Sequence, residues 1–414
     1  MLDNYTLHNA LVVSSSEKVY TGAIRVHNRR LGYTLSGPQI DLEKKSFVYP
    51  ALINTHDHLR GNYLPRVGPA PGTFYLNWLP WDNDLKVSDT FAERSRLSPD
   101  EIYYLSAYKN LFSGVTTVND HFPQDFNRKI LPYLPIRAFL GYGLAHESSS
   151  YDLKWGDGIE LEHERALKNE WPFITHLSEG FDEESMRGIH YLEQVGVLDD
   201  HCVLIHCIGL SDADIKKAAA AGASIVWCAA SNMFMFNVTC KIRKLLQSGV
   251  NVTIGTDSTH TGSINLFAEI HYDRELYRNL YGEELPAKTL FNMVTINAAR
   301  AFHMEDRLGT LDFGKMADVL ILKAKTEDPF ENFANATMED IELLTMAGKP
   351  LYGEMRFMDL IGGTLQDSYT SITVGGIPRF VIGDPAGRYR QARQKIGFNK
   401  MLDFLPFEPE SESS

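Results

Sequence analysis

Histidines follow directly on several apolar segments of this 414-residue chain. His56 and His58 end the apolar stretch that begins at Phe47, and a spacing of two residues places both imidazoles on one side of an extended chain. Such a pair can chelate a metal ion, but two histidines at a strand end are about as often ordinary surface residues. The pair alone leaves both interpretations open.

Three further apolar segments end in residues that bind metals. Two run into His176 and His206, and a third runs into Asp257. In a (β/α)₈ barrel the carboxyl ends of the strands converge on the face that holds the active site. Four imidazoles and one carboxylate suit Zn²⁺ or Fe²⁺ better than Mg²⁺ or Ca²⁺. The whole set therefore predicts a site for a divalent metal ion.

Glu179 lies three residues after His176, just beyond the predicted strand end. A glutamate in this position is commonly the solvated start of a helix. Beside a metal ion it can instead take a proton from a bound water, whose pKa zinc lowers to about 7, and deliver it to a leaving group. The predicted metal site favours this second interpretation.

The loop after the first histidine pair is rich in aromatic residues. Trp78 and Trp81 are followed by Asp82. The rings could sandwich a planar heterocycle while Asp82 accepts hydrogen bonds from it, or they could pack the loop onto the barrel rim. Arg60 and His121, near two strand ends, are further candidates for substrate contacts that also have a structural interpretation.

Strands and helices alternate through the middle of the chain. Strands are expected at 47–54, 115–119, 137–142, 173–176, 203–206, 224–228 and 250–256, and helices at 99–112, 183–195, 212–221, 242–247 and 288–303. This alternation predicts a parallel sheet with crossover helices, closed into a (β/α)₈ barrel. A helix at 160–169 leaves little room between 142 and 171, so the fourth unit is expected to be irregular or shortened.

Short apolar runs separated by turn residues occupy both ends of the chain. They lie before residue 47 and from 319 onward, where Gly375 and Gly376 form a hairpin signal. A small antiparallel sheet is expected in the first of these regions.

The composition disfavours several classes of partner. Lys and Arg number 40 against 53 Asp and Glu, and the formal net charge of −13 disfavours nucleic acid and anionic membranes. No apolar stretch approaches the roughly 18 residues of a membrane span. The four cysteines lack C-x-x-C spacing and the chain starts without a basic and apolar leader, so a cytoplasmic setting is expected.

Several motifs resemble those of the amidohydrolase superfamily, in particular its branch of cytosine deaminase-like and adenosylhomocysteine deaminase-like enzymes, to which chlorohydrolases are related. They are PALINTHDH at 50–58, GVTTVND at 114–120, THLSE at 175–179, LIHCIGLSD at 204–212, SN at 231–232, IGTDS at 254–258 and LGTLDFGKMADVLIL at 308–322. The resemblance implies a barrel over 49–306 and a small β-sandwich built from 1–48 and 307–402. A flexible tail is expected over 403–414.

The resemblance also implies roles for individual residues. The metal ligands would be His56, His58, His176 and Asp257. Glu179 would be the proton shuttle, and His206 would contact the attacking water or polarise the substrate, with Asp257 also orienting the nucleophile. Binuclear relatives carry a carboxylated lysine at a middle strand end. No lysine ends the segment 137–143, so one ion is expected, zinc in preference to iron.

The expected reaction is hydrolytic deamination of a nitrogen heterocycle (a purine, pyrimidine or related cyclic amidine) by a metal-bound hydroxide. Hydrolysis of a cyclic amide and dechlorination of a triazine are alternatives at the same site. A non-catalytic scaffold is a remote alternative, because every ligand position is filled. The expected partner is a small heterocyclic molecule, and a homo-oligomer stays open.

Overall fold

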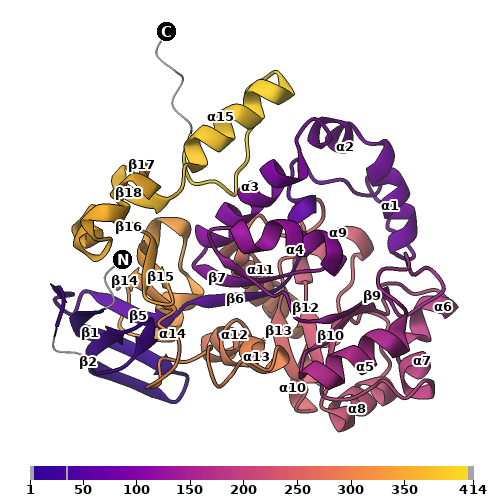
Figure 1. Cartoon of the computed structure of the whole chain (residues 1–414). Coiled ribbons are helices and arrows are strands. Elements are labelled where there is room, and N and C mark those ends of the chain that lie inside the picture. The colour runs from indigo at the N-terminus through magenta and orange to yellow at the C-terminus, as the bar shows by residue number, and fades with distance from the viewer. Residues whose placement is uncertain (1–3, 34–35, 409–414) are drawn as a thin grey trace.

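The computed structural model describes residues 4–33 and 36–408 (Figure 1). Both ends of the chain contribute to one ten-stranded sheet, in which the indigo strands of the N-terminal segment lie beside the orange and yellow strands of the C-terminal segment. Its members are β1 (Asn4–Ser15), β2 (Lys18–His27), β3 (Arg30–Leu31), β4 (Gln39–Asp41), β5 (Ser46–Pro50), β14 (Val319–Lys323), β15 (Ile341–Met346), β16 (Lys349–Glu354), β17 (Tyr369–Val374) and β18 (Ile377–Ile382).

The strand β5 joins the two ends of the chain. The sheet runs in the order β17-β18-β16-β15-β14-β5-β1-β2-β3, with β4 also paired to β1. In it, β5 pairs in parallel with β1 and antiparallel with β14, where Val48 lies opposite Ile321. The predicted short strands at both chain ends are thus present and share one sheet.

Parallel strands fill the middle of the chain in two sheets. One has the order β6 (Leu52–Asp57), β7 (Val115–Asp120), β8 (Arg137–Ala138). The other has the order β13 (Asn251–Ile254), β12 (Ser224–Trp227), β11 (Cys202–His206), β10 (Phe173–Leu177), β9 (Gly143–Glu147). The pairings within both sheets are parallel. The predicted mixed α/β fold with parallel strands is confirmed.

Hydrogen bonds link the two parallel sheets. Between the edge strands β6 and β13, the Thr55 hydroxyl donates to the Ile254 carbonyl at 2.7 Å. The Asp257 amide donates to the His56 carbonyl at 3.1 Å. Nε2 of His121, just after the middle strand β7, lies 3.1 Å from the Ala145 carbonyl of the edge strand β9. These contacts bring the ends of β6, β7, β9 and β13 together.

Helices α1 to α13 lie between or after the parallel strands, and α14 and α15 follow strands of the large sheet. They are α1 (Trp78–Val87), α2 (Asp89–Arg94), α3 (Pro99–Leu111), α4 (Gln124–Ile130), α5 (Ile159–Asn169), α6 (Glu183–Met186), α7 (Gly188–Gln194), α8 (Asp212–Ala221), α9 (Ala229–Phe236), α10 (Ile242–Gln247), α11 (Leu266–Tyr281), α12 (Ala287–Met293), α13 (Ile296–Ala301), α14 (Pro329–Ala334) and α15 (Pro385–Ile396). Local sequence fixes several starts: α3 begins after a Ser98–Glu101 capping box, and α8 after the pair Ser211–Asp214.

Two predicted strands differ from the structure. The segment 47–54 divides at Ala51 into β5 and β6, which belong to different sheets. The segment 137–142 is a strand only over β8, and β9 follows after four residues with no helix between them. The fourth parallel strand, β9, is followed by α5 and packs closely against it, since a Cβ on Gly143 would lie 2.3 Å from the Glu162 carbonyl oxygen. The irregularity expected in the fourth unit therefore lies one unit earlier, at β8, which is two residues long and has no helix after it.

Two predicted helices are each divided in two. The stretch 183–195 breaks between α6 and α7, where Gly188 packs so closely that an added Cβ would lie 2.8 Å from Leu177 and from Ser148. The stretch 288–303 breaks between α12 and α13. There the Val294 carbonyl accepts a hydrogen bond from the Ile53 amide of β6, which removes it from the helical pattern.

The chain between 403 and 408 packs against the protein, which corrects the expected flexible tail over this part. Phe404 is fully buried, and the Phe407 ring lies 5.7 Å from that of Phe112 on α3. Aromatic burial of this size outweighs the local Pro and Asp signals for a loose end. Residues 409–414 lie outside the described part of the chain. Within the described part, no helix combines the length and apolar character needed to cross a membrane.

Candidate metal centre and active site

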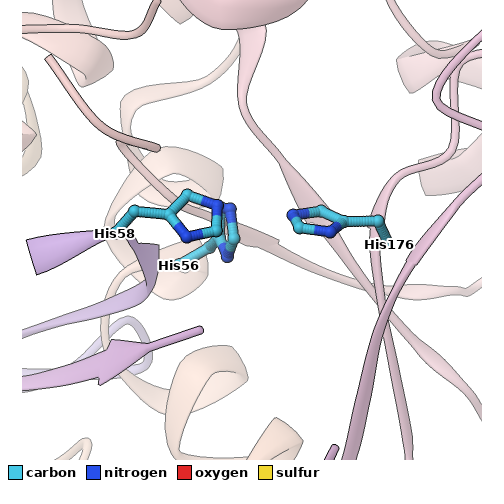
Figure 2. A group of neighbouring side chains, drawn as sticks. All are labelled: His56, His58 and His176. Atoms are coloured by element: carbon cyan, nitrogen blue, oxygen red, sulfur yellow. The ribbon is translucent and has the colours of Figure 1, made fainter. Parts of the chain in front are cut away.

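Three histidine rings face one another at the carboxyl ends of the parallel strands (Figure 2). His56 and His58 come from the end of β6, and His176 from β10. One ring nitrogen of each lies within 4.8 Å of the others. Alternation along β6 turns these two side chains to one face and Asp57 to the other.

Asp257 joins this cluster from just beyond β13. Its Oδ1 lies 3.7 Å from Nε2 of His56 and 3.7 Å from Nε2 of His58. Its other oxygen accepts hydrogen bonds from Ser231 at 2.6 Å and Thr261 at 3.0 Å, which fixes the carboxylate plane. Burial favours a neutral carboxyl, but the neighbouring histidines and these hydrogen bonds outweigh it and lower the pKa of Asp257.

Backbone carbonyls set the tautomers of two of these rings. Nδ1 of His58 lies 3.1 Å from the His121 carbonyl, and Nδ1 of His176 lies 2.7 Å from the His146 carbonyl. A carbonyl can only accept, so Nδ1 carries the proton in both rings and Nε2 keeps its lone pair for the centre of the cluster. This is the usual arrangement of histidines that ligate metals.

His56 is fully buried, and among the described residues neither of its ring nitrogens has a hydrogen-bond partner. Burial, together with the charges of neighbouring histidines, holds its pKa well below the ordinary value, so the ring is neutral. A buried polar group without a partner is costly unless a ligand satisfies it. The orphaned nitrogens and the nitrogen-rich donor set fit a divalent metal such as zinc.

Glu179 and His206 form a buried pair beside the cluster. Nε2 of His206 lies 3.6 Å from Oε1 of Glu179, while its Nδ1 donates to the Asn232 side-chain oxygen at 2.8 Å. His206 and Asp257 both have positive φ, at 67° and 53°. Left-handed backbone at bulky residues stores strain, and such strain clusters at functional sites.

A buried lysine supports the site from behind. Nζ of Lys109 on α3 contacts Asp57 at 3.0 Å, Asn62 at 2.9 Å and the Thr256 hydroxyl at 3.1 Å. Lys109 and Asp57 are both fully buried. The ion pair thus ties α3 to the ends of β6 and β13, where the candidate ligands lie. Sequence analysis missed Lys109, because nothing in the helix pattern distinguishes it from a solvent-exposed lysine.

A cavity of about 390 Å³ opens above the cluster. Of the predicted substrate contacts, Arg60, Trp78, Trp81 and Asp82 line it. Trp78 donates from Nε1 to Glu147 and Trp81 to the Val67 carbonyl, while Asp82 forms an ion pair with Lys86 at 2.5 Å. Cavities of this size suit small organic molecules.

His121 does not line this cavity, which corrects its expected role as a substrate contact. It is fully buried, stacks on His176 with ring centroids 4.3 Å apart, and its Nε2 is engaged by the Ala145 carbonyl. It therefore packs behind a candidate ligand. Asp120, which directly precedes His121, is also buried and accepts a hydrogen bond from the Leu59 amide.

Sequence analysis missed other residues of the cavity wall, including His146, Trp155, Arg94 and His260. His146 ends β9, and its ring lies 4.5 Å from that of Trp78 and 4.6 Å from that of Trp155. Its signal is present in the sequence, because Leu144 and Ala145 lead into a histidine as the apolar runs before His176 and His206 do. Arg94 and His260 lie on segments without such a pattern.

Comparisons with known proteins show what the chain is similar to. The sequence profile of the amidohydrolase family matches residues 163–350. A 5-methylthioadenosine/S-adenosylhomocysteine deaminase of Syntrophobacter fumaroxidans is 33% identical over 167 residues, which is 38% of each chain. One from Caldanaerobacter subterraneus is 25% identical over 77% of this chain and 84% of the relative.

Solved structures have the same fold. An adenosine deaminase from Xanthomonas campestris with bound zinc superimposes with a TM-score of 0.68 at 19% identity, covering 95% of this chain and 98% of that one. Atrazine chlorohydrolase from Arthrobacter aurescens in complex with zinc gives 0.67 at 20% identity, covering 84% and 95%.

The resemblance to the amidohydrolases is thereby confirmed. Parallel α/β architecture, a buried cluster of histidines with one aspartate, the family match over residues 163–350 and the deaminase relatives together support a metal-dependent hydrolase that acts on carbon–nitrogen bonds.

Proposed function

We propose that the protein catalyses the hydrolytic deamination of a small nitrogen heterocycle, a purine, pyrimidine or related cyclic amidine. The observation that carries this proposal is the buried Glu179–His206 pair, whose facing atoms lie 3.6 Å apart beside the histidine cluster and on the cavity wall. The curated relatives named as adenosine-type deaminases favour the same reaction.

One divalent ion, zinc in preference to iron, would be held by His56, His58, His176 and Asp257. The orphaned nitrogens of His56 and the Nε2 lone pairs of the other two histidines support this assignment. When bound, such an ion lowers the pKa of a coordinated water to about 7 and so makes a nucleophile available at neutral pH.

The protein's own groups would then move protons and fix orientation. Glu179 takes a proton from the attacking water and gives it to the ring nitrogen next to the carbon that is attacked. It then carries the remaining proton of the water from the newly added hydroxyl to the amino group. The carbon–nitrogen bond breaks, ammonia leaves and a carbonyl group remains on the ring. His206, held by Asn232, presents Nε2 to the reacting groups, and Asp257 Oδ1 orients the water.

The finer architecture is part of the same proposal. The parallel strands β6 to β13 would form one (β/α)₈ barrel over 49–306, supported by the hydrogen bonds between β6 and β13 and between the end of β7 and β9. The large sheet would belong to a β-sandwich built from 1–48 and 307–402. Because β5 (Ser46–Pro50) belongs to the large sheet and β6 begins at Leu52, the structure favours a first boundary at Ala51, shortly after residue 48.

Product analysis tests the reaction class. Zinc-loaded protein is incubated with amino-purines, amino-pyrimidines, cyclic amides and a chlorotriazine, and ammonia, ring-opened product and chloride are measured separately. We expect ammonia in proportion to the oxo-heterocycle formed, and its absence with a His206→Ala control. Chloride or a ring-opened acid as the dominant product, with no ammonia, would assign the site to one of the other two reactions.

A further inference from the structure

Two arginines line the cavity without a carboxylate partner. Arg94, the last residue of α2, is 9% exposed, and its only hydrogen bond within the described residues runs from Nη1 to Nε2 of His260 at 2.9 Å. Arg60 is exposed toward the cavity, and its guanidinium lies over the rings of Phe122 and Phe126, at 5.3 and 5.8 Å from their centroids. Within residues 4–33 and 36–408 neither forms an ion pair.

Both arginines are tied to segments that carry candidate metal ligands. Arg60 lies two residues after His58, and His260, which accepts from Arg94, lies three residues after Asp257. Because the guanidinium can only donate, His260 Nε2 must be unprotonated. The contact therefore leaves the full positive charge of Arg94 uncompensated on the wall of the reaction site.

An unpaired buried charge is expensive, and two like charges near each other add to the cost. Burial and the charge of Arg60 lower the pKa of Arg94 to about 10, so the group stays charged at neutral pH. The nearby carboxylates are already engaged: Asp82 pairs with Lys86, and Asp120 accepts from the Leu59 amide and the Tyr103 hydroxyl.

Aromatic faces orient the two guanidinium groups. The Phe91 centroid lies 4.6 Å from Cζ of Arg94, as the rings of Phe122 and Phe126 lie near Arg60. Contact with a ring face uses the plane of a guanidinium and leaves the N–H groups at its edge free to donate. Such edges match the paired oxygens of a carboxylate or phosphate, which bind them with two parallel hydrogen bonds.

We infer that the substrate carries an anionic oxygen group, a carboxylate or a phosphate, which Arg60 and Arg94 bind while the heterocycle lies at the metal site. This inference rests on the proposed deamination for the position of the ring. Arg60 and Arg94 would then determine specificity, and neither would take part in the bond-breaking step.

Matched substrates test the inference. Ammonia release and binding by calorimetry are compared for adenosine, adenosine 5′-carboxylate, its carboxamide and adenosine 5′-monophosphate, and for cytosine and 5-carboxycytosine. Binding is measured on zinc-loaded Glu179→Gln protein. We expect at least one anionic compound to surpass its neutral counterpart by about 10- to 100-fold in affinity and kcat/KM, the range of a charge-assisted hydrogen bond. The two adenosine anions distinguish carboxylate from phosphate.

Variants assign the preference to the two arginines. Arg94→Gln and Arg60→Gln should each bring the ratio of kcat/KM for the anion to that for its neutral counterpart close to one. Arg187→Gln is the control, since Arg187 is exposed away from this cavity and pairs with Glu183. If Arg94→Gln does not fold, Arg60→Gln decides, because Arg60 donates no hydrogen bond within the described residues.

Equal binding of anionic and neutral compounds, or a preference that persists in both variants, would overturn the inference while leaving deamination intact. Binding of an anion that depends on the arginines, without any ammonia from any compound, would support the inference and contradict the proposed reaction. The two failures are therefore separable.

Discussion

At the scale of single residues, the site is defined by which groups lack partners and which have them. His56 is buried with both ring nitrogens free, whereas His206 is anchored by Asn232 through Nδ1. His56 therefore has nitrogens available for a metal ion, whereas His206 is held in one tautomer with Nε2 toward the reacting atoms. The same reasoning applies to Arg94, which forms no ion pair with any residue that the structure describes.

Asn232 is a positioning residue for His206. In Asn232→Leu the proton at Nδ1 loses its acceptor, and the ring can adopt the other tautomer. We expect kcat to fall about 10- to 100-fold, with KM and zinc content nearly unchanged. Steady-state kinetics and metal analysis measure this. Asn232→Asp, which keeps an acceptor, should restore part of the rate, and a loss of the same size in both variants would contradict the role.

Lys109 and Asp57 form a fully buried ion pair with a contact of 3.0 Å. Removing one partner leaves the other charge buried, so Lys109→Met should lower the free energy of unfolding by about 3–5 kcal/mol. Chemical denaturation measures this. The control is Lys168→Met, because Lys168 on α5 is exposed. Adding Asp57→Asn to Lys109→Met should recover part of the loss. A Lys109→Met protein as stable as the control would contradict the account.

At the scale of elements, the strands that end in candidate metal ligands or catalytic residues could be predicted, because an apolar run and a following turn coincide there. The buried segments before His176, His206 and Asp257 are short, apolar and followed by turns, and each continues as a parallel strand. The strand β9 escaped prediction because it follows β8 without a helix and contains only Gly143, Leu144 and Ala145 before its polar end. Tertiary packing by Glu162, rather than periodicity, fixes it.

His121 and His146 show the limit of reasoning from strand ends. His121 follows β7 directly and His146 is the last residue but one of β9, but His121 packs behind His176, whereas His146 faces the cavity between two tryptophans. Which way a side chain points one residue beyond a strand depends on backbone geometry, which local sequence does not determine. The metal-ligand candidates could therefore be found from sequence, and most of the cavity wall could not.

The helix α11 carries a buried acidic pair, Glu269 and Asp273. Among the described residues, neither carboxyl oxygen of Asp273 has a hydrogen-bond partner. Burial raises the pKa of Glu269 to about 7 and raises that of Asp273 as well, with Glu269 adding to the effect. The folded protein thus binds more protons than the unfolded chain between about pH 4.5 and 7. The contribution of this pair to stability must therefore fall as the pH rises through this window, whereas buried histidines such as His56, whose pKa is lowered, contribute in the opposite sense.

Denaturation at pH 5 and pH 8 measures this dependence. For Glu269 alone the fall amounts to about 3 kcal/mol. Asp273→Asn should reduce the fall, because it removes one of the two charges, whereas Glu275→Gln on the exposed face of the same helix should not. Equal pH dependence in all three proteins would show that the pair does not titrate in this range.

At the scale of the whole molecule, a chain with a net charge of −13 concentrates unpaired positive charge at one cavity. The parallel sheets bring residues from β6, β10, β11 and β13 to that point, and the large sheet joins both chain ends beside them. Stability and metal binding should be coupled, because an ion that bridges these strands binds only the folded state.

Removal of metal by a chelator should therefore lower Tm, and zinc at about 100 times its Kd should restore about 2.7 kcal/mol of stability. Calorimetry of the metal-free and zinc-loaded protein measures the shift. His56→Ala serves as the matched control, since it should lose the response to zinc. An identical shift in His56→Ala would place the stabilising ion elsewhere.

The most direct test of the central claim is the activity of Glu179→Gln at full zinc content, measured as ammonia released from the best substrate of the panel. Glutamine keeps the shape of the side chain beside His206 but cannot carry protons between water and the leaving group. The account predicts a loss of at least about 100-fold in kcat with zinc content and substrate binding retained. Undiminished ammonia release from the zinc-loaded variant would contradict it.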